Sequence, residues 1–172
     1  GTDLIVGARA GTVQLLLYAV FRLGEPTANV SWSTYQDIAN APNVAWTVPL
    51  SLGDSHKGYR VLGTTPAYFE YYRYSNRQPL TFAQGGAFDG VYDAVLGSEV
   101  AQALGYTLDQ DIVIAHGIGR VSVANHDDKP FRVVGILAAT GTPVDRTVHV
   151  SLAAIEAIHL DWQSGTRLPG RG

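Results

Sequence analysis

His126, Asp127 and Asp128 place three metal-capable side chains next to one another in the sequence. Imidazole and carboxylate groups are ligands that zinc and similar divalent cations accept. Adjacent residues point in different directions, however, and the chain has no H-x-x-x-H or H-x-x-E-H spacing, in which two histidines share a helix face. A solvated acidic loop between two strands explains these residues as simply. We expect such a loop, with a metal site at His126, Asp127 and Asp128 as the alternative.

A Ser–His–Asp set could be drawn from Ser98, from His116 or His149, and from one of several aspartates. The G-x-S-x-G turn that exposes a serine nucleophile is absent. Ser98 instead stands at the predicted start of a helix. We therefore expect no enzymatic activity, and we expect His56, His149 and His159 at the surface or at an interface.

Glycine-rich turns are further candidates for a cofactor site. Residues 4–12 read LIVGARAGT and residues 117–119 read GIG, and such turns can present backbone N–H groups to a phosphate. Neither turn has the G-x-G-x-x-G pattern with a βαβ continuation, or the lysine and hydroxyl of a P-loop. We therefore expect plain structural turns and no cofactor.

The composition excludes several other classes of function. The absence of cysteine rules out disulfides, thiol catalysis and cysteine-ligated zinc. The 15 acidic and 12 basic residues are scattered without long runs and give a net charge of −3, which disfavours binding to nucleic acid or an anionic membrane surface. The longest apolar runs fall short of the roughly 20 residues that a membrane helix needs.

Four tyrosines, Tyr68, Tyr71, Tyr72 and Tyr74, follow closely on a Thr-Pro pair that is typical of a helix start. They could form an aromatic cradle for a ligand. Tyrosines on a short helix more often form a core face with an interface rim. We therefore expect them to pack.

Hydrophobic periodicity and turn residues predict the elements of the N-terminal half. We expect a strand at residues 4–6, an apolar stretch at 13–21 that fits strand or helix, a capped helix at 34–40, and strands at 44–52 and 59–62 around a turn at 53–58. Pro49 should lie at an edge or a bulge. The tyrosine helix follows, and the polar, glycine-rich residues 75–92 should connect two subdomains.

The C-terminal half shows a more compact pattern. We expect strands at residues 94–96, 112–115, 121–123, 131–137 and 147–150, and helices at 99–104 and 152–160. Gly105 should end the first helix and Ser151 should cap the second. Residues 163–172 carry glycines and a proline without hydrophobic periodicity, which indicates a loop or frayed end.

Several motifs occur in a characteristic order. The text AVLGSEVAQALG is followed by FRVVGILAATGTPVDRTVHVSLAAIEAI, and VPLSLGDSHKGYRVLGTTPAYFEYY precedes both. This order resembles the periplasmic core domain of MacB/FtsX-like ABC transporter permeases, with its V-x-G-x-x-P-x-Y-F, V-L-G-x-x-V-A and F-x-V-V-G-I-L segments. The N-terminal LIVGARAGTVQLLLYAVFRLGEPTANVSW looks like the segment after the first membrane helix in one branch of that family.

The resemblance implies an α+β fold of two subdomains, a membrane-proximal α/β part and an inserted, mainly β unit with short helices. We assign residues 1–90 to the membrane-proximal, porter-like subdomain, which would be incomplete in its C-terminal half. Residues 91–162 would form the inserted unit, and residues 163–172 a loop or disordered end. Because the sequence has no methionine, we expect a trimmed chain, cut out from between two membrane helices.

The resemblance also implies a non-catalytic domain on the periplasmic side of the cytoplasmic membrane, which couples ATP hydrolysis to export, lipoprotein extraction or signalling. The implied partners are the flanking transmembrane helices of the same full-length chain, a cytoplasmic ATP-binding subunit that this domain does not contact, a second permease subunit, and a periplasmic adaptor or lipoprotein. The alternatives are a stand-alone periplasmic binding module, perhaps one that binds metal, and a small hydrolase.

Overall fold

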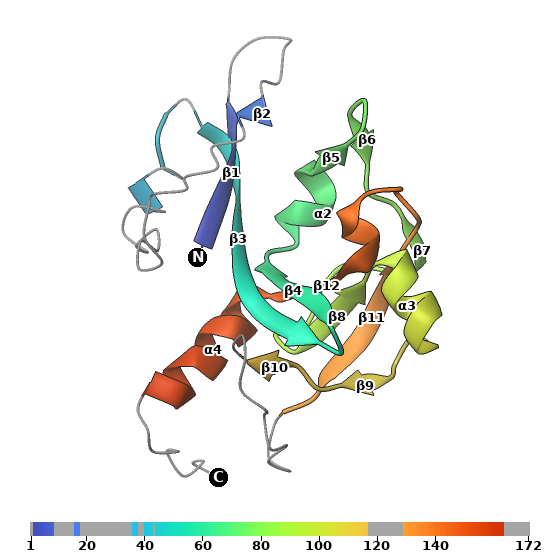
Figure 1. Cartoon of the computed structure of the whole chain (residues 1–172). Helices are drawn as coiled ribbons and strands as arrows, with labels where there is room; N and C mark the ends of the chain where they lie inside the picture. Colours follow the sequence, from blue (N-terminus) through green and yellow to red (C-terminus); the bar gives the residue numbers. More distant parts are fainter. Residues whose placement is uncertain are drawn as a thin grey trace.

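The computed structural model describes residues 2–8, 16–17, 36–37, 40–42, 44–116 and 129–163. Within these residues the centre is a ten-stranded mixed sheet with the order β2-β1-β3-β4-β12-β8-β11-β7, with β10 beside β3 and β9 beside β11 (Figure 1). Its strands are β1 (Thr2–Ala8), β2 (Leu16–Leu17), β3 (Val44–His56), β4 (Tyr59–Thr64), β7 (Phe82–Gly85), β8 (Asp93–Leu96), β9 (Asp111–Ile112), β10 (Ala115–His116), β11 (Phe131–Leu137) and β12 (Thr147–Ser151).

Short helices and one hairpin complete the described fold. They are α2 (Ala67–Tyr71), α3 (Ser98–Leu104), the 3₁₀ helix η1 (Pro143–Arg146), α4 (Leu152–Gln163) and the hairpin β5 (Arg73–Tyr74) with β6 (Gln78–Pro79). Gly105 ends α3 in the left-handed conformation, with φ of 67°, and the Ser151 hydroxyl accepts a hydrogen bond from the N–H of Ala154 at the start of α4. The predicted α+β class and both of these helix ends are confirmed.

The central strands of the sheet are buried on both faces, which makes two hydrophobic cores. Neighbouring residues of one strand, such as Val95 and Leu96, belong to opposite cores because side chains alternate along a strand. The core under α3 and α4 contains Val61, Ala94, Leu96, Val100, Ala101, Ile112, Ile114, Phe131, Val133, Ile136, Val148, Val150, Ala154 and Ile155. The core under α2 and η1 contains Val48, Leu62, Tyr68, Phe69, Leu80, Val95, Leu137 and Val144.

The hairpin of β3 and β4 is confirmed, but its turn is tighter than expected. The sequence predicted a turn over residues 53–58, whereas β3 continues to His56 and only Lys57 and Gly58 form the turn. Both turn residues have positive φ, 46° and 85°. Two residues with positive φ match the right-handed twist of the flanking strands, so the strands stay paired up to the turn.

Gly53, the first glycine of that predicted turn, is instead a bulge within β3. Leu52 pairs with Leu62 and Asp54 pairs with Val61, so Gly53 is an extra residue in β3. Its φ of 148° favours glycine. Leu62 and Val61 face opposite cores, so their partners Leu52 and Asp54 also face opposite sides of the sheet. The bulge therefore reverses the faces of the side chains that follow it in β3 and directs Asp54 to the α3 side.

The prediction that Pro49 lies at an edge or a bulge is wrong, because Pro49 lies in the interior strand β3 and away from the bulge at Gly53. It pairs with Leu4 of β1, while the pairing of β3 with β4 begins only at Ser51. The Pro49 carbonyl accepts a hydrogen bond from the Thr64 hydroxyl at 2.8 Å, which places the backbone atoms of Pro49 on the β4 side. The missing N–H therefore costs no ladder hydrogen bond there.

Residues 75–92, which we predicted to connect two subdomains, contain strands that the sequence did not indicate. This stretch contains β6 and β7, and β7 pairs with β11 at the end of the sheet. Leu80 is buried in the α2-side core. The sequence did not indicate the strand β7 because its composition is polar and glycine-rich. Such a composition is possible because β7 lies at an edge of the sheet, where most of its side chains are exposed.

The division at residue 90 stays a prediction. β4 of the first assigned range and β8 of the second both pair with β12, in one continuous sheet. The strand predicted at residues 4–6 lies within β1 and is confirmed. Only residues 16–17 of the apolar stretch 13–21 and residues 36–37 of the helix at 34–40 are assigned, as strand and helix. The strand at 121–123 and the end at 164–172 lie outside the described residues.

Candidate functional site

His56 forms a buried polar cluster at the end of β3, on the side to which the bulge directs it. Only 4% of its surface is exposed, so the prediction of a surface histidine is wrong. Its Nδ1 lies 2.6 Å from the Val113 carbonyl and its Nε2 lies 2.7 Å from the Tyr106 hydroxyl. A carbonyl can only accept, so Nδ1 carries the proton and Nε2 accepts from Tyr106. We call these three residues the His56 clamp.

The electrostatics of the His56 clamp favour a structural role. Burial lowers the pKa of His56 below its ordinary value, the hydrogen bond to Val113 opposes this change, and the charge of Lys57 adds to it. The ring is therefore neutral near pH 7, and both its nitrogens are engaged. Such a histidine holds two segments together and has no free nitrogen for a proton transfer or a metal. One local signal of this arrangement was present in the sequence, a glycine inside a strand pattern, which suggests a bulge.

His149 is also buried, with 0% exposure, and its predicted surface position is wrong as well. Its Nδ1 lies 3.0 Å from the carbonyl of Val95, while its Nε2 has no hydrogen-bond partner in the described part of the chain. Burial is the main cause that lowers the pKa of His149 to about 4. The valines on either side of it were the overlooked signal, because a strand that is apolar at successive positions is covered on both faces.

The serine hydrolase alternative finds no support in these positions. Ser98 is the first residue of α3, and neither ring nitrogen of His149 contacts it. The backbone of His116 lies in β10, opposite Asp54 of β3. The structure therefore does not bring Ser98 and His149 together as nucleophile and base.

The predicted metal ligands His126, Asp127 and Asp128 lie outside the described residues, as does the side chain of His159. Within the described ranges, no three His, Asp or Glu side chains are grouped so that they could hold a metal ion. A metal site in residues 126–128 thus stays a prediction.

The tyrosines after the Thr-Pro pair pack, as predicted. Tyr68 is 3% exposed and stacks on Tyr72, with ring centroids 4.9 Å apart. Tyr71 stacks on Trp46 of β3, with centroids 4.5 Å apart and planes only 8° from parallel. These contacts attach α2 to the sheet through its rings.

The candidate phosphate-binding turn at residues 4–12 does not belong to a dinucleotide-binding unit. Such a unit places its first strand in a parallel sheet, whereas β1 is antiparallel to both β2 and β3. Residues 9–12 and the second glycine turn at 117–119 lie outside the described residues.

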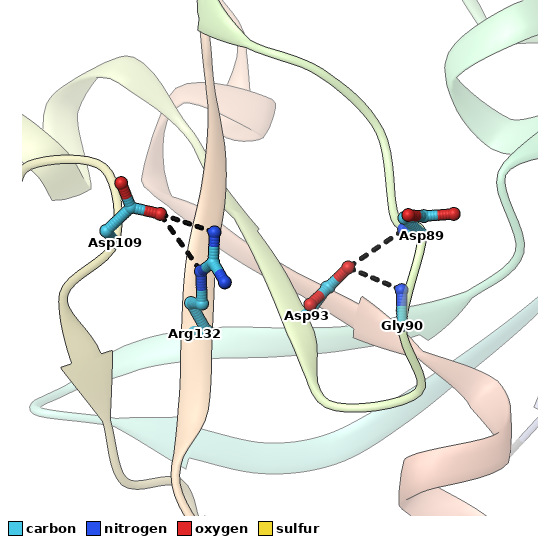
Figure 2. Close-up of polar contacts among 5 residues, drawn as sticks. All are labelled: Asp89, Gly90, Asp93, Asp109 and Arg132. Atoms are coloured by element: carbon cyan, nitrogen blue, oxygen red, sulfur yellow. Dashed lines mark hydrogen bonds and ion pairs between the residues drawn. The ribbon is translucent and has the colours of Figure 1, made fainter.

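Two exposed polar groups organise the loops around β8 and β11 (Figure 2). The Asp93 carboxylate accepts hydrogen bonds from the N–H groups of Asp89 and Gly90, at 2.8 and 2.6 Å. Arg132 donates to Asp109, with an Nη2–Oδ1 distance of 2.6 Å. Both side chains of the ion pair are more than half exposed, so solvent screens it and it contributes little to stability. These contacts hold the loops that flank β8 and β11.

Comparison with known proteins identifies the family of this chain, which the geometry of its polar residues does not. The chain matches the family described as MacB-like periplasmic core domain over residues 4–168 of its 172. No curated protein matches it. None of the helices in the described ranges is both long and apolar enough to cross a membrane. Domains of the matched family are extracytoplasmic parts of ABC transporter permeases. Since the match spans nearly the whole sequence, this chain belongs to the family of MacB-like periplasmic core domains.

Proposed function

We propose that this domain has no chemistry of its own and transmits movement. It would couple ATP hydrolysis in the cytoplasm to export, lipoprotein extraction or signalling on the periplasmic side of the inner membrane. The match to MacB-like periplasmic core domains over residues 4–168 carries the proposal. A transmitting domain needs stiff elements that link its ends, and the described fold supplies one.

That element is β3, the longest strand of the described sheet. Its first part, from Val44 to Ser51, pairs with β1, and its second part, from Ser51 to His56, pairs with β4. In the described sheet order β3 alone joins the β1–β2 ladder to β4 and the strands beyond it. Because β1 and β4 are hydrogen-bonded to successive parts of the same strand, a displacement of β1 would be passed along β3 to β4.

The His56 clamp supports the same role at the far end of β3. Tyr106 follows α3 and its C-terminal Gly105, and Val113 follows β9. The clamp therefore ties the end of β3 to two segments that come much later in the chain. Movement of β3 would reach α3 and β9 through these side chains as well as through the sheet.

We also propose the partners of the domain. The flanking transmembrane helices would belong to the same full-length chain, and a cytoplasmic ATP-binding subunit would act across the membrane without touching the domain. A second permease subunit and a periplasmic adaptor or lipoprotein would complete the assembly. In this arrangement residues 1–90 are the membrane-proximal subdomain and residues 91–162 the inserted unit.

Energy transfer between the domain and the lipid surface tests the proposal. The domain has no cysteine, so, once any cysteine elsewhere in the full-length permease is replaced, a single donor dye can be placed at Gln102→Cys on α3 or at Gln78→Cys on β6, both of which are exposed positions. The full-length permease is reconstituted in nanodiscs with its ATP-binding subunit, and acceptor dyes are placed in the lipid headgroups. We expect the transfer efficiency at both positions to change between the nucleotide-free and the vanadate-trapped state.

A hydrolysis-deficient ATP-binding subunit is the control, because it separates ATP binding from turnover. If the assembly hydrolyses ATP but the transfer efficiency at each position stays the same in every nucleotide state, the transmitting role is refuted. A change at one position alone would show that α3 and β6 move separately, and it would support the division into two subdomains.

A further inference from the structure

His149 is an uncompensated polar group in the middle of the sheet. It lies on β12 between β4 and β8 and is completely buried. The carbonyl of Val95 on β8 satisfies Nδ1. Nε2 has no hydrogen-bond partner in the part of the chain that the structure describes. A buried nitrogen without a partner is unusual in a well-packed fold and calls for an explanation.

Helix α2 forms the cover over His149. The ring of Tyr68 lies 5.3 Å from the imidazole and that of Phe69 lies 5.6 Å away, centroid to centroid. The helix is five residues long, and no side chain caps its N-terminus. Its attachment to the sheet depends on these buried rings and on the stack of Tyr71 on Trp46.

The charged groups around His149 give its protonated form no compensation. On β4, the Arg60 guanidinium is positive and acts against a second positive charge. On β8, the Asp93 carboxylate is engaged by the N–H groups of Asp89 and Gly90. On α2, Tyr68 presents an aromatic ring to the imidazole, and Glu70 is exposed to solvent.

We propose that His149 is an acid sensor whose protonation releases α2 from the sheet before the rest of the domain unfolds. An imidazolium needs an acceptor or water at Nε2, and the rings of α2 exclude both. Displacement of this short helix, whose N-terminus no side chain caps, would admit water to Nε2. It also exposes the aromatic side chains of the α2-side core, which would become available to a partner. This inference does not depend on the proposed transmitting function.

The direction of the pH effect follows from linkage. The pKa of His149 is lowered to about 4 in the closed state, whereas an imidazole in water titrates near 6.5. The open state therefore binds the proton more tightly, and the closed state loses stability as the pH falls from about 6.5 to about 4. Within that window the opening equilibrium shifts by about tenfold per pH unit, up to a total of about 300-fold.

Trp46 provides an optical probe of α2, because its ring stacks on Tyr71 of that helix. The full chain with Trp32→Phe and Trp162→Phe retains Trp46 as its single tryptophan, since the sequence has three. Tryptophan fluorescence and far-UV circular dichroism are followed together from pH 7.5 to 3. We expect the fluorescence to change at higher pH than the loss of the sheet signal.

Two replacements of His149 serve as matched variants in that background. His149→Phe keeps a flat aromatic ring, and His149→Asn keeps a donor near the Val95 carbonyl, but neither side chain titrates. We expect the early fluorescence change to disappear in either variant. Coincident fluorescence and circular dichroism transitions in the parent, or an early change that persists in a folded variant, would overturn the proposal.

Hydrogen exchange on the wild-type chain tests the proposal even if neither variant folds. The Tyr72 amide donates to the Tyr68 carbonyl at the end of α2, and its protection factor should fall about tenfold per pH unit below about 6.5. The Arg132 amide, which donates to the Tyr92 carbonyl where β11 meets the start of β8, is the reference. An equal loss of protection at both amides would mean global unfolding and would refute local release of α2.

Discussion

Removal of one hydroxyl group from the His56 clamp should destabilise the domain measurably. Tyr106→Phe takes away the donor that lies 2.7 Å from Nε2 of His56. A typical hydrogen bond contributes about 1 kcal/mol, and a buried acceptor left without its partner costs about 1 to 3 kcal/mol. His56 is 4% exposed, so its nitrogen has little access to water. We expect Tyr106→Phe to lower the free energy of unfolding by about 2 kcal/mol at pH 7.

A double-mutant cycle with His56→Phe isolates this interaction. His56→Phe also removes the hydrogen bond to Val113, but that loss is common to both variants that carry it and cancels in the cycle. In the His56→Phe background, Tyr106→Phe should cost less than about 0.5 kcal/mol. The coupling free energy should therefore be about 1 to 2 kcal/mol.

Urea unfolding followed by circular dichroism measures the four stabilities. For a domain of this size, 2 kcal/mol corresponds to a melting temperature lower by roughly 4 to 8 °C, which thermal unfolding can check independently. Tyr71→Phe is a control for the loss of a tyrosine hydroxyl elsewhere. If Tyr106→Phe costs the same with and without His56, the hydroxyl does not act through this histidine and the structural role of the clamp is refuted.

Three further predictions concern the packing of η1 and the expected absence of ligands. Gly97→Ala should lower the free energy of unfolding by about 2 kcal/mol or more, because the new Cβ would collide with the backbone carbonyl oxygens of Val144 and Asp145. Gly105→Ala is the comparison: Gly105 has a φ of 67° but open space around it, so this change should cost about 1 kcal/mol through backbone strain alone. Urea unfolding that ranks the two variants in reverse would contradict this packing. If residues 126–128 are a solvated loop, zinc should leave the melting temperature unchanged at pH 7 and at mildly acidic pH, and His126→Ala should change stability by no more than ~0.5 kcal/mol. A zinc-dependent rise in melting temperature that is lost in His126→Ala would establish a metal site there. Such a site would stabilise the fold by about 2.7 kcal/mol at a zinc concentration of one hundred times the dissociation constant. The domain should not bind ATP, since the sequence has no G-x-x-x-x-G-K-[ST] motif, and saturable micromolar binding in calorimetry would contradict this.

The C-terminal half of the described fold could be read from the sequence because its signals are local. Residues 131–137 were predicted as a strand and form β11 with the same bounds. Gly105 and Ser151 mark the ends of their helices through contacts within a few residues. Turn and cap chemistry is decided by neighbours along the chain, and one sequence suffices to predict it.

The burial of the histidines was decided by the tertiary structure. His149 reads as one polar residue in a strand, and only the pairing of β12 between β4 and β8, with α2 above it, removes it from water. His56 would face the opposite core without the bulge at Gly53, and its partners Tyr106 and Val113 are 50 and 57 residues away in the chain. Contacts at such separations depend on the sheet order, which local patterns do not encode.

The sequence by itself determined the α+β class, the main helices and strands of residues 93–105 and 131–160, and the motifs that identify the family, but it merged the two short strands β9 and β10 into one strand at 112–115. The helices and strands follow from side-chain periodicity and from backbone preferences of glycine, proline and capping residues, whereas the α+β class was implied by the resemblance that those motifs carry. The three-dimensional packing decided that residues 75–92 supply an edge strand, that Pro49 sits in an interior strand, and that two histidines are buried. The physical reason is the same in each case. Other segments of the chain decide whether a strand lies at an edge, whether a backbone group faces a ladder partner, and whether a side chain is shielded from water.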